Sequence, residues 1–234
     1  MILVGDSPNE LPLKAENKTR FVCVSDTHGK TAFNFPIPDG DVFIHSGDVT
    51  KYSHEDEWSK SIAWIESLPH AVKIVTGGNH DFDLDDRFGN VANKQEILAS
   101  MEQAGITYLE HESYQLPEAL GGFKMFVSPY APMHLGGAFM PRDTAPYWEK
   151  IPQDTQILVT HTPPYGYHDR TSRGMHVGCK ALLRKIKAIR PRVCIFGHIH
   201  EAHGWSQEHG TLMINACICD RRYRASQRPI IFDL

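Results

Sequence analysis

Five short, largely apolar runs recur along the chain, and each is long enough for one buried strand. They occupy residues 21–24, 42–44, 72–75, 157–159 and 193–196. A continuous run rich in β-branched and aromatic residues is typical of a strand buried on both faces. Further strand-like segments follow at residues 107–116, 123–127, 211–215 and 229–232. Because these late strands outnumber the helices, we expect mixed sheets in an α/β (α+β) fold.

Three segments show helical periodicity. The first follows Ser53, a predicted N-cap, has three acidic residues in its first turn and ends before Pro69. The second spans about residues 94–103. The third follows Gly178 and ends before Pro191, and its basic side chains face solvent, opposite an apolar stripe. That stripe consists of Cys179, Leu182, Leu183, Ile186 and Ile189.

The chain of 234 residues suits one domain, because that length buries about 70% of the surface of the unfolded chain. No internal repeat or linker divides it. Residues 1–19 include Gly5, Pro8, Asn9 and Pro12 and are predicted to form an irregular N-terminal lead-in. Residues 20–234 are predicted to form the single domain.

Composition narrows the class of partner. The net charge of −4 disfavours a general nucleic-acid binder, since such domains usually carry a basic surplus. No apolar run approaches the roughly 20 residues that span a bilayer, and the apolar start of the chain is too short for a signal-peptide core. We therefore expect a cytoplasmic protein that does not bind membranes.

The five cysteines are odd in number, and several lie within apolar patterns. A disulfide framework is therefore not expected. Cys217 and Cys219 lack a second cysteine pair at zinc-finger spacing, so we interpret them as structural thiols.

Polar motifs follow the five strand-like runs. They are Asp-Thr-His at 26–28, Gly-Asp at 47–48, Gly-Asn-His-Asp at 78–81, Thr-His at 160–161 and Gly-His-Ile-His at 197–200. Each motif alone is weak, but ligands in open α/β sheets gather at the carboxyl ends of strands. Imidazole, carboxylate and amide groups brought together there make a two-metal hydrolytic site.

This ordered set resembles the calcineurin-like metallophosphoesterase superfamily, whose pattern is DxH, GD, GNH(D/E), H and GHxH. The resemblance runs from about Arg20 to the C-terminus. Residues 196–201, 176–179 and 229–234 further resemble the small metallophosphoesterase-domain-containing subfamily, regarded as cyclic-nucleotide-type phosphodiesterases. The resemblance implies a four-layer α/β/β/α sandwich of two mixed sheets with metals at one edge.

The resemblance also implies the ligand set. Asp48 would bridge two metals, with Asp26, His28 and His200 completing one site and Asn79, His161 and His198 completing the other. Nitrogen and oxygen ligands of this kind suit Mn²⁺, our first choice, with Fe or Zn²⁺ as alternatives.

Two neighbouring residues receive other roles from the resemblance. His80 would protonate the leaving oxygen or stabilise the phosphorane, work that suits an imidazole. Asp81 would fix the orientation of His80, or would instead only cap the turn after the strand. His45 would orient a metal ligand through a hydrogen bond or would have a packing role only.

A loop between a predicted ligand and the third helix is a candidate for substrate recognition. It carries His168, Arg170, Arg173 and His176. Guanidinium groups match phosphate oxygens, although a solvent-exposed role for both arginines stays open. His176 is favoured by its subfamily match. Residues 128–140 depart from the aromatic-rich form of the animal subfamily members, which leaves the substrate open.

These patterns predict a metal-dependent phosphoester hydrolase that uses attack by metal-bound hydroxide with His80 assisting. A small phosphoester or nucleotide, such as 2′,3′-cyclic AMP, is the expected substrate. Two alternatives stay open: the same dinuclear scaffold serving a non-phosphoester reaction in metabolism, and a non-catalytic nucleotide-binding or scaffold protein. A protein serine/threonine phosphatase is less favoured, because the chain lacks room for an extended substrate groove.

Overall fold

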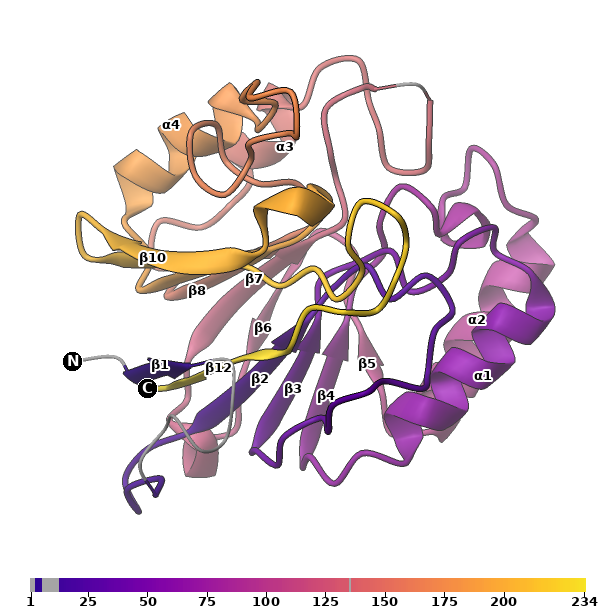
Figure 1. Cartoon of the computed structure of the whole chain (residues 1–234), viewed down its shortest axis with the longest axis horizontal. Helices are drawn as coiled ribbons and strands as arrows, with labels where there is room; N and C mark the ends of the chain where they lie inside the picture. The colour runs from indigo at the N-terminus through magenta and orange to yellow at the C-terminus, as the bar shows by residue number, and fades with distance from the viewer. Residues whose placement is uncertain (1–2, 6–12, 135) are drawn as a thin grey trace.

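The computed structural model describes residues 3–5, 13–134 and 136–234, which form two six-stranded mixed sheets packed face to face (Figure 1). The first sheet contains, in spatial order, β1 (Leu3–Gly5), β12 (Ile230–Asp233), β2 (Arg20–Val24), β3 (Val42–His45), β4 (Val72–Val75) and β5 (Thr107–Tyr108). The second contains β10 (Gly204–Glu208), β11 (Thr211–Asn215), β9 (Val193–Phe196), β8 (Ile157–Thr160), β7 (Lys124–Ser128) and β6 (Glu112–Gln115).

Both sheets have a parallel centre and antiparallel edges. Strands β2 to β5 pair in parallel, as do β11, β9, β8 and β7, whereas β1, β12, β10 and β6 pair antiparallel to their neighbours. The carboxyl ends of the central strands therefore meet at one edge of each sheet.

The main core lies between the two sheets. Phe21 of β2 stacks on Phe232 of β12 with ring centres 4.7 Å apart, and both are fully buried. Val127, Ile195 and Ile214 contribute to the same cluster from the second sheet. Apolar area shared by both inner faces is the main force that holds the sheets together.

Helices cover the two outer faces (Figure 1). Helices α1 (Glu55–Glu66) and α2 (Val91–Gln103) pack on the first sheet, and α3 (Ala145–Glu149) and α4 (Lys180–Ile189) pack on the second. Short 3₁₀ turns η1 (Phe82–Leu84), η2 (Glu118–Leu120) and η3 (His200–Ala202) complete the elements. The predicted α/β/β/α sandwich is confirmed.

The start of α1 differs from the prediction. Its N-cap is His54, because the Glu57 carboxylate accepts the His54 N–H. The same carboxylate accepts the N–H groups of Lys51 and Tyr52, which fixes the turn before the helix. Ser53, the predicted N-cap, instead has φ +59° and donates its hydroxyl to the carbonyl of His80.

Other boundaries also move. Residues 107–116 were predicted as one strand, yet the chain crosses there from β5 in the first sheet to β6 in the second. Helix α2 begins three residues before the predicted start because the Asn90 side chain accepts the Ala92 N–H. Helix α3 and strand β10 were not predicted.

The N-terminal prediction is wrong for Leu3–Gly5, because these residues form β1 and pair with β12. Residues 6–12 lie outside the described part of the chain. All five cysteines are buried free thiols. Within the described residues, no helix has both the length and the apolar character needed to cross a membrane.

Candidate dinuclear metal site

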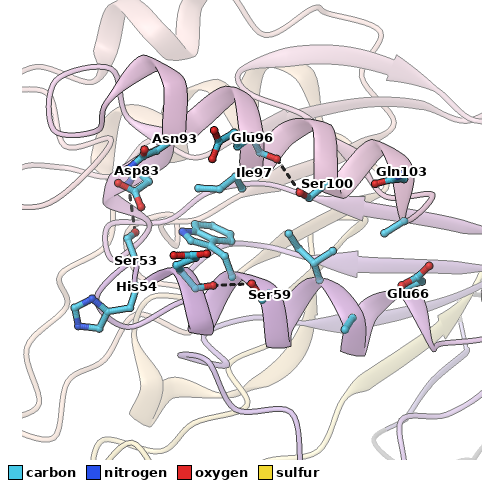
Figure 2. Close-up of a pocket in the computed structure, with 15 residues that line it drawn as sticks. Ser53, His54, Ser59, Glu66, Asp83, Asn93, Glu96, Ile97, Ser100 and Gln103 are labelled. Carbon is cyan, nitrogen blue, oxygen red and sulfur yellow. Dashed lines mark hydrogen bonds between the residues drawn. The ribbon is translucent and has the colours of Figure 1, made fainter.

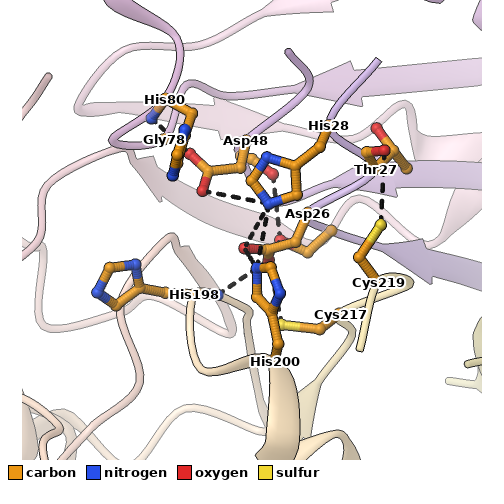
Figure 3. Close-up of polar contacts among 12 residues, drawn as sticks. Asp26, Thr27, His28, Asp48, Gly78, His80, His198, His200, Cys217 and Cys219 are labelled. Carbon is orange, nitrogen blue, oxygen red and sulfur yellow. Dashed lines mark hydrogen bonds and ion pairs between the residues drawn. The ribbon is translucent and has the colours of Figure 1, made fainter. Parts of the chain in front are cut away.

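Seven predicted ligands come together where the two sheets meet. Figure 3 shows five of them: Asp26, His28, Asp48, His198 and His200. Asp26 and His28 follow β2, Asp48 follows β3, and Asn79 follows β4. The second sheet supplies His161 after β8, and His198 and His200 after β9. Four of these ligands have left-handed backbone, with φ between +49° and +68°: Asp26, His28, Asp48 and His198. Such strain is stored at functional sites, where the surroundings enforce it.

Two glycines let the ligand loops approach closely. A Cβ at Gly197 would lie 2.1 Å from an Asp26 carboxylate oxygen and 2.1 Å from the Ser25 hydroxyl. A Cβ at Gly78 would lie 2.3 Å from Asp48 Oδ1. Neither distance is compatible with a side chain, so both carboxylates depend on glycine at these positions.

One ligand cluster is built from Asp26, His28 and His200, whose donor atoms lie within 4.8 Å of one another. His200 Nε2 is 3.1 Å from His28 Nε2 and 3.2 Å from Asp26 Oδ1. The second Asp26 oxygen accepts the Ser25 and Cys217 side chains and the His198 N–H. Asp26 is therefore fixed by its own neighbours, with Oδ1 facing the histidines.

The other cluster contains Asp48, His161 and His198. His161 Nε2 lies 3.5 Å from Asp48 Oδ1 and 2.9 Å from Asn79 Oδ1. Asp48 Oδ2 lies 3.9 Å from His28 Nε2, so this carboxylate faces both clusters. Its position suits the bridging role that the resemblance implies.

The histidine rings are oriented by backbone carbonyls. Nδ1 of His28, His161 and His200 lies 3.0 to 3.3 Å from the carbonyl oxygens of Thr50, Ser46 and Asp220, respectively. A carbonyl oxygen only accepts, so each Nδ1 carries a proton and each Nε2 is the nitrogen turned to the site. Metal-ligating histidines are usually held in this way.

The four histidine ligands form two pairs that differ in pKa. Burial lowers the pKa of His28 to about 4 and that of His198 to about 3, so both are neutral. Burial would also lower the pKa of His161 and His200, but the charges of Asp48 and Asp26, respectively, raise each to about 9. The same contacts hold the pKa values of both carboxylates below their usual range.

This donor set fits two divalent cations. Two carboxylates, four inward-facing imidazole nitrogens and one amide oxygen converge, and the Nε2 atoms of His28 and His200 are too close for two unshared lone pairs. A shared cation or proton must separate them. Asp26, His28 and His200 would hold one metal, and Asn79, His161 and His198 the other, with Asp48 between them.

His80 lies against the first cluster. Its ring centre is 4.8 Å from that of His28, and it forms a third candidate group with His28 and Asp48. Its N–H donates to Asp48 Oδ1 and its ring Nδ1 donates to the carbonyl of Lys51. Nε2 is therefore the ring atom left for chemistry.

Asp81 does not hold the His80 ring, which is a correction to the orienting role implied by the resemblance. Its buried carboxylate accepts the N–H groups of Val49, Thr50 and Gly78 and the Thr50 hydroxyl. These donors favour the charged form, while burial and Asp48 raise its pKa to about 7. Asp81 therefore ties the loop after β3 to the loop after β4, as in the alternative turn-capping role.

The predicted substrate loop is held by contacts within itself and with residues 202–206. His168 contacts the Ala202 carbonyl and the Ser206 hydroxyl, and Arg170 donates to Gly174 within the loop. Arg173 is exposed. His176 keeps 40% of its side chain exposed and donates Nδ1 to Asp169, a buried carboxylate 2.6 Å away. The ring of His176 is thus fixed by a buried carboxylate.

His45, for which a supporting role or a packing role was predicted, contacts the loop that carries two ligands. Its Nε2 lies 2.9 Å from the hydroxyl of Thr27, between Asp26 and His28.

Sequence reasoning missed one aromatic side chain beside the ligands. Tyr223 packs its ring 4.8 Å from His28 and 5.2 Å from His200. Tyr223 belongs to no motif. The one signal in the sequence was its position in the loop before β12.

A separate groove of about 700 Å³ runs between α1 and α2 (Figure 2). Its rim is acidic and includes Glu55, Glu66, Asp83 and Glu96. None of the predicted ligands lines it, so it is not the candidate metal site.

Comparisons with known proteins identify the family of the chain. The model of the calcineurin-like phosphoesterase family matches residues 19–202. The chain is 36% identical to metallophosphoesterase domain-containing protein 1 of Homo sapiens, over 99% of this chain and 76% of that protein. It is 38% identical to a UPF0046 protein of Caenorhabditis elegans, over 94% and 82% of the two chains.

A solved structure supports the fold. The phosphopantetheinyl hydrolase of Mycobacterium tuberculosis matches with a TM-score of 0.60, over 92% of this chain and 96% of that one. The sequences are 14% identical, so this likeness concerns the fold alone.

Proposed function

Because this chain belongs to the calcineurin-like phosphoesterase family, we propose that it is a metal-dependent phosphodiesterase with a dinuclear site. Small phosphoesters are its substrates, with nucleotides such as 2′,3′-cyclic AMP first among them. The observation that carries the proposal is the shared carboxylate: Asp48 Oδ1 lies 3.5 Å from His161 while Oδ2 lies 3.9 Å from His28.

When bound, two divalent cations supply Lewis-acid activation of water and of the phosphoryl oxygens. Mn²⁺ is our choice, since nitrogen and oxygen donors are mixed here. The chain's part is to keep the donors fixed. Three of the imidazoles are held by carbonyls, and Asp26 is held by Ser25, Cys217 and the His198 N–H.

His80 supplies the proton for the leaving oxygen. Its Nδ1 is bound to the Lys51 carbonyl at 2.8 Å, so the proton that can move is the one on Nε2. A protonated His80 donates that proton as the phosphorus–oxygen bond breaks, and it recovers a proton from water afterwards. His176, oriented by Asp169, serves as a further contact to the substrate.

The test uses metal-stripped protein to which Mn²⁺ is added. Bis-p-nitrophenyl phosphate, p-nitrophenyl phosphate and 2′,3′-cyclic AMP rank diesters against monoesters, and Asp48→Asn and His80→Ala are the variants. We expect the two diesters to be hydrolysed faster than the monoester, with both variants slower by at least about 100-fold. No turnover at saturating Mn²⁺ with two bound ions would overturn the proposal.

A further inference from the structure

Lys51, three residues after the predicted ligand Asp48, forms no ion pair with a carboxylate among the described residues. Lys51 Nζ lies 4.9 Å from the centre of the Tyr52 ring and 4.8 Å from that of Tyr223. Aromatic faces attract an ammonium ion without neutralising its charge. In the part of the chain that the structure describes, no carboxylate pairs with Lys51, although other lysines do form such pairs.

Tyr223 places this charge close to the site. The Tyr223 ring also contacts two histidine rings, with centres 4.8 Å away for His28 and 6.3 Å for His80. One tyrosine therefore contacts the Lys51 ammonium, a predicted metal ligand and the predicted proton donor.

The loop that carries Tyr223 is firmly held. Asp220 accepts the N–H groups of Arg222 and Arg224 and binds the Arg224 guanidinium. Gln227 Nε2 lies 2.8 to 3.1 Å from three carbonyl oxygens, including that of His200. Tyr223 is thus tied to the same segment as a metal ligand.

The turn that carries Lys51 is held equally well. Glu57 accepts the N–H groups of Lys51 and Tyr52, and the Lys51 carbonyl accepts His80 Nδ1. The backbone that carries Lys51 and the loop that carries Tyr223 are therefore both preorganised, which favours recognition of a ligand.

Charge balance indicates what Lys51 recognises. Two divalent cations together with Asp26 and Asp48 would leave a surplus of about two positive charges, which the monoanionic phosphodiester and the attacking hydroxide together would balance. The positive charge of Lys51 is therefore not needed to balance the reacting phosphoryl group. A second anionic group of the substrate would balance it.

We propose that Lys51, held between Tyr52 and Tyr223, binds a second anionic group of the substrate. The preferred phosphoesters then carry a further phosphate or carboxylate beside the reacting phosphoryl group. This inference rests on the proposed function and deepens it by naming the substrate class.

Binding provides the deciding test. Equilibrium dialysis at saturating Mn²⁺ compares 3-phosphonopropionate with propylphosphonate, which have similar shapes, resist hydrolysis and differ by one carboxylate. Wild-type protein is expected to bind the carboxylate compound about tenfold tighter, and Lys51→Met to lose that preference. The matched control is Lys150→Met, since Lys150 Nζ also lies over a tyrosine, 5.8 Å from the Tyr147 ring centre. The control is expected to keep the preference.

Hydrolysis is measured on a second pair, thymidine 5′-(p-nitrophenyl phosphate) with and without a 3′-phosphate. The ratio of the two kcat/KM values is expected to fall about tenfold in Lys51→Met and to stay at the wild-type value in Lys150→Met. Equal binding preference in wild type and Lys51→Met overturns the inference. If the binding preference depends on Lys51 but neither diester is hydrolysed, the inference stands and the proposed function fails.

Discussion

The Nε2 atoms of His28 and His200 lie 3.1 Å apart, and both rings donate Nδ1 to a backbone carbonyl. Two neutral imidazoles in that arrangement would point lone pairs at each other. In metal-stripped protein a proton on His200 resolves the conflict, because the pKa of His200 is raised to about 9 while burial lowers that of His28 to about 4. His161 is arranged similarly, with Nδ1 on the Ser46 carbonyl and Nε2 2.9 Å from Asn79.

Metal binding should therefore release protons. His161 and His200 are both protonated at pH 7.5 in metal-stripped protein, since their pKa values are raised to about 9, and each must lose a proton to bind a cation. We expect about two protons per chain on saturation with Mn²⁺, measured with a pH indicator in weakly buffered solution. His161→Asn should release about one. Release of none from wild type would contradict the assignment of both residues as ligands.

The stability of metal-stripped protein should fall at alkaline pH. A histidine whose folded pKa is raised stabilises the fold fully below its unfolded value near 6.5, and that stabilisation disappears as pH rises through the folded value of about 9. Urea unfolding at pH 6.5 and pH 9.5 measures the loss. His161→Asn should show a smaller loss than wild type. An identical pH dependence in the two proteins would rule out a raised pKa for His161.

Gly197→Ala should remove one of the two metals. The added Cβ would lie 2.1 Å from Asp26 and from Ser25, so the carboxylate has to leave its position. We expect hydrolysis to fall by at least about 100-fold and one metal to be lost, measured by metal analysis of the dialysed protein.

Gly210→Ala is the control for that substitution. Gly210 has φ +88° and no atom near its added Cβ, so alanine there costs about 1 kcal/mol of backbone strain but leaves the ligands in place. Its bound metal should equal that of wild type. If Gly197→Ala also kept both metals, close approach of Gly197 to Asp26 would not matter for the site.

Local sequence predicted the parts of the site that depend on local structure. Each ligand follows a strand directly or closely, so residue type and strand position together placed Asp26, Asp48 and His161 at one edge of the sheets. The same reasoning failed for residues 107–116. A turn at His111, with φ +59°, separates the two strands, and histidine gave no sign of it.

Contacts between distant segments were not predictable in this way. Tyr223 reaches His28, and Asp220 reaches His200, only because β12 returns antiparallel beside β2 and brings the preceding loop over the site. The pattern of apolar residues in β12 predicted a strand but not its neighbour. The misplaced role of Asp81 has the same origin, since three of its four donors are on Val49 and Thr50 of another loop.

Asp81→Asn tests whether Asp81 acts on the loops. Asp81 Oδ2 accepts the N–H groups of both Val49 and Gly78. An NH₂ group in place of this oxygen can only donate, so both hydrogen bonds would be lost. We expect a loss of about 1–3 kcal/mol in the free energy of unfolding, measured by urea denaturation. Thr50→Val, which removes the hydroxyl that donates to Asp81 Oδ1, should cost less, about 1 kcal/mol, because the backbone donors remain. If Asp81→Asn unfolded like wild type and only the pH profile of kcat changed, Asp81 would act through His80 and the loop-tying role would be wrong.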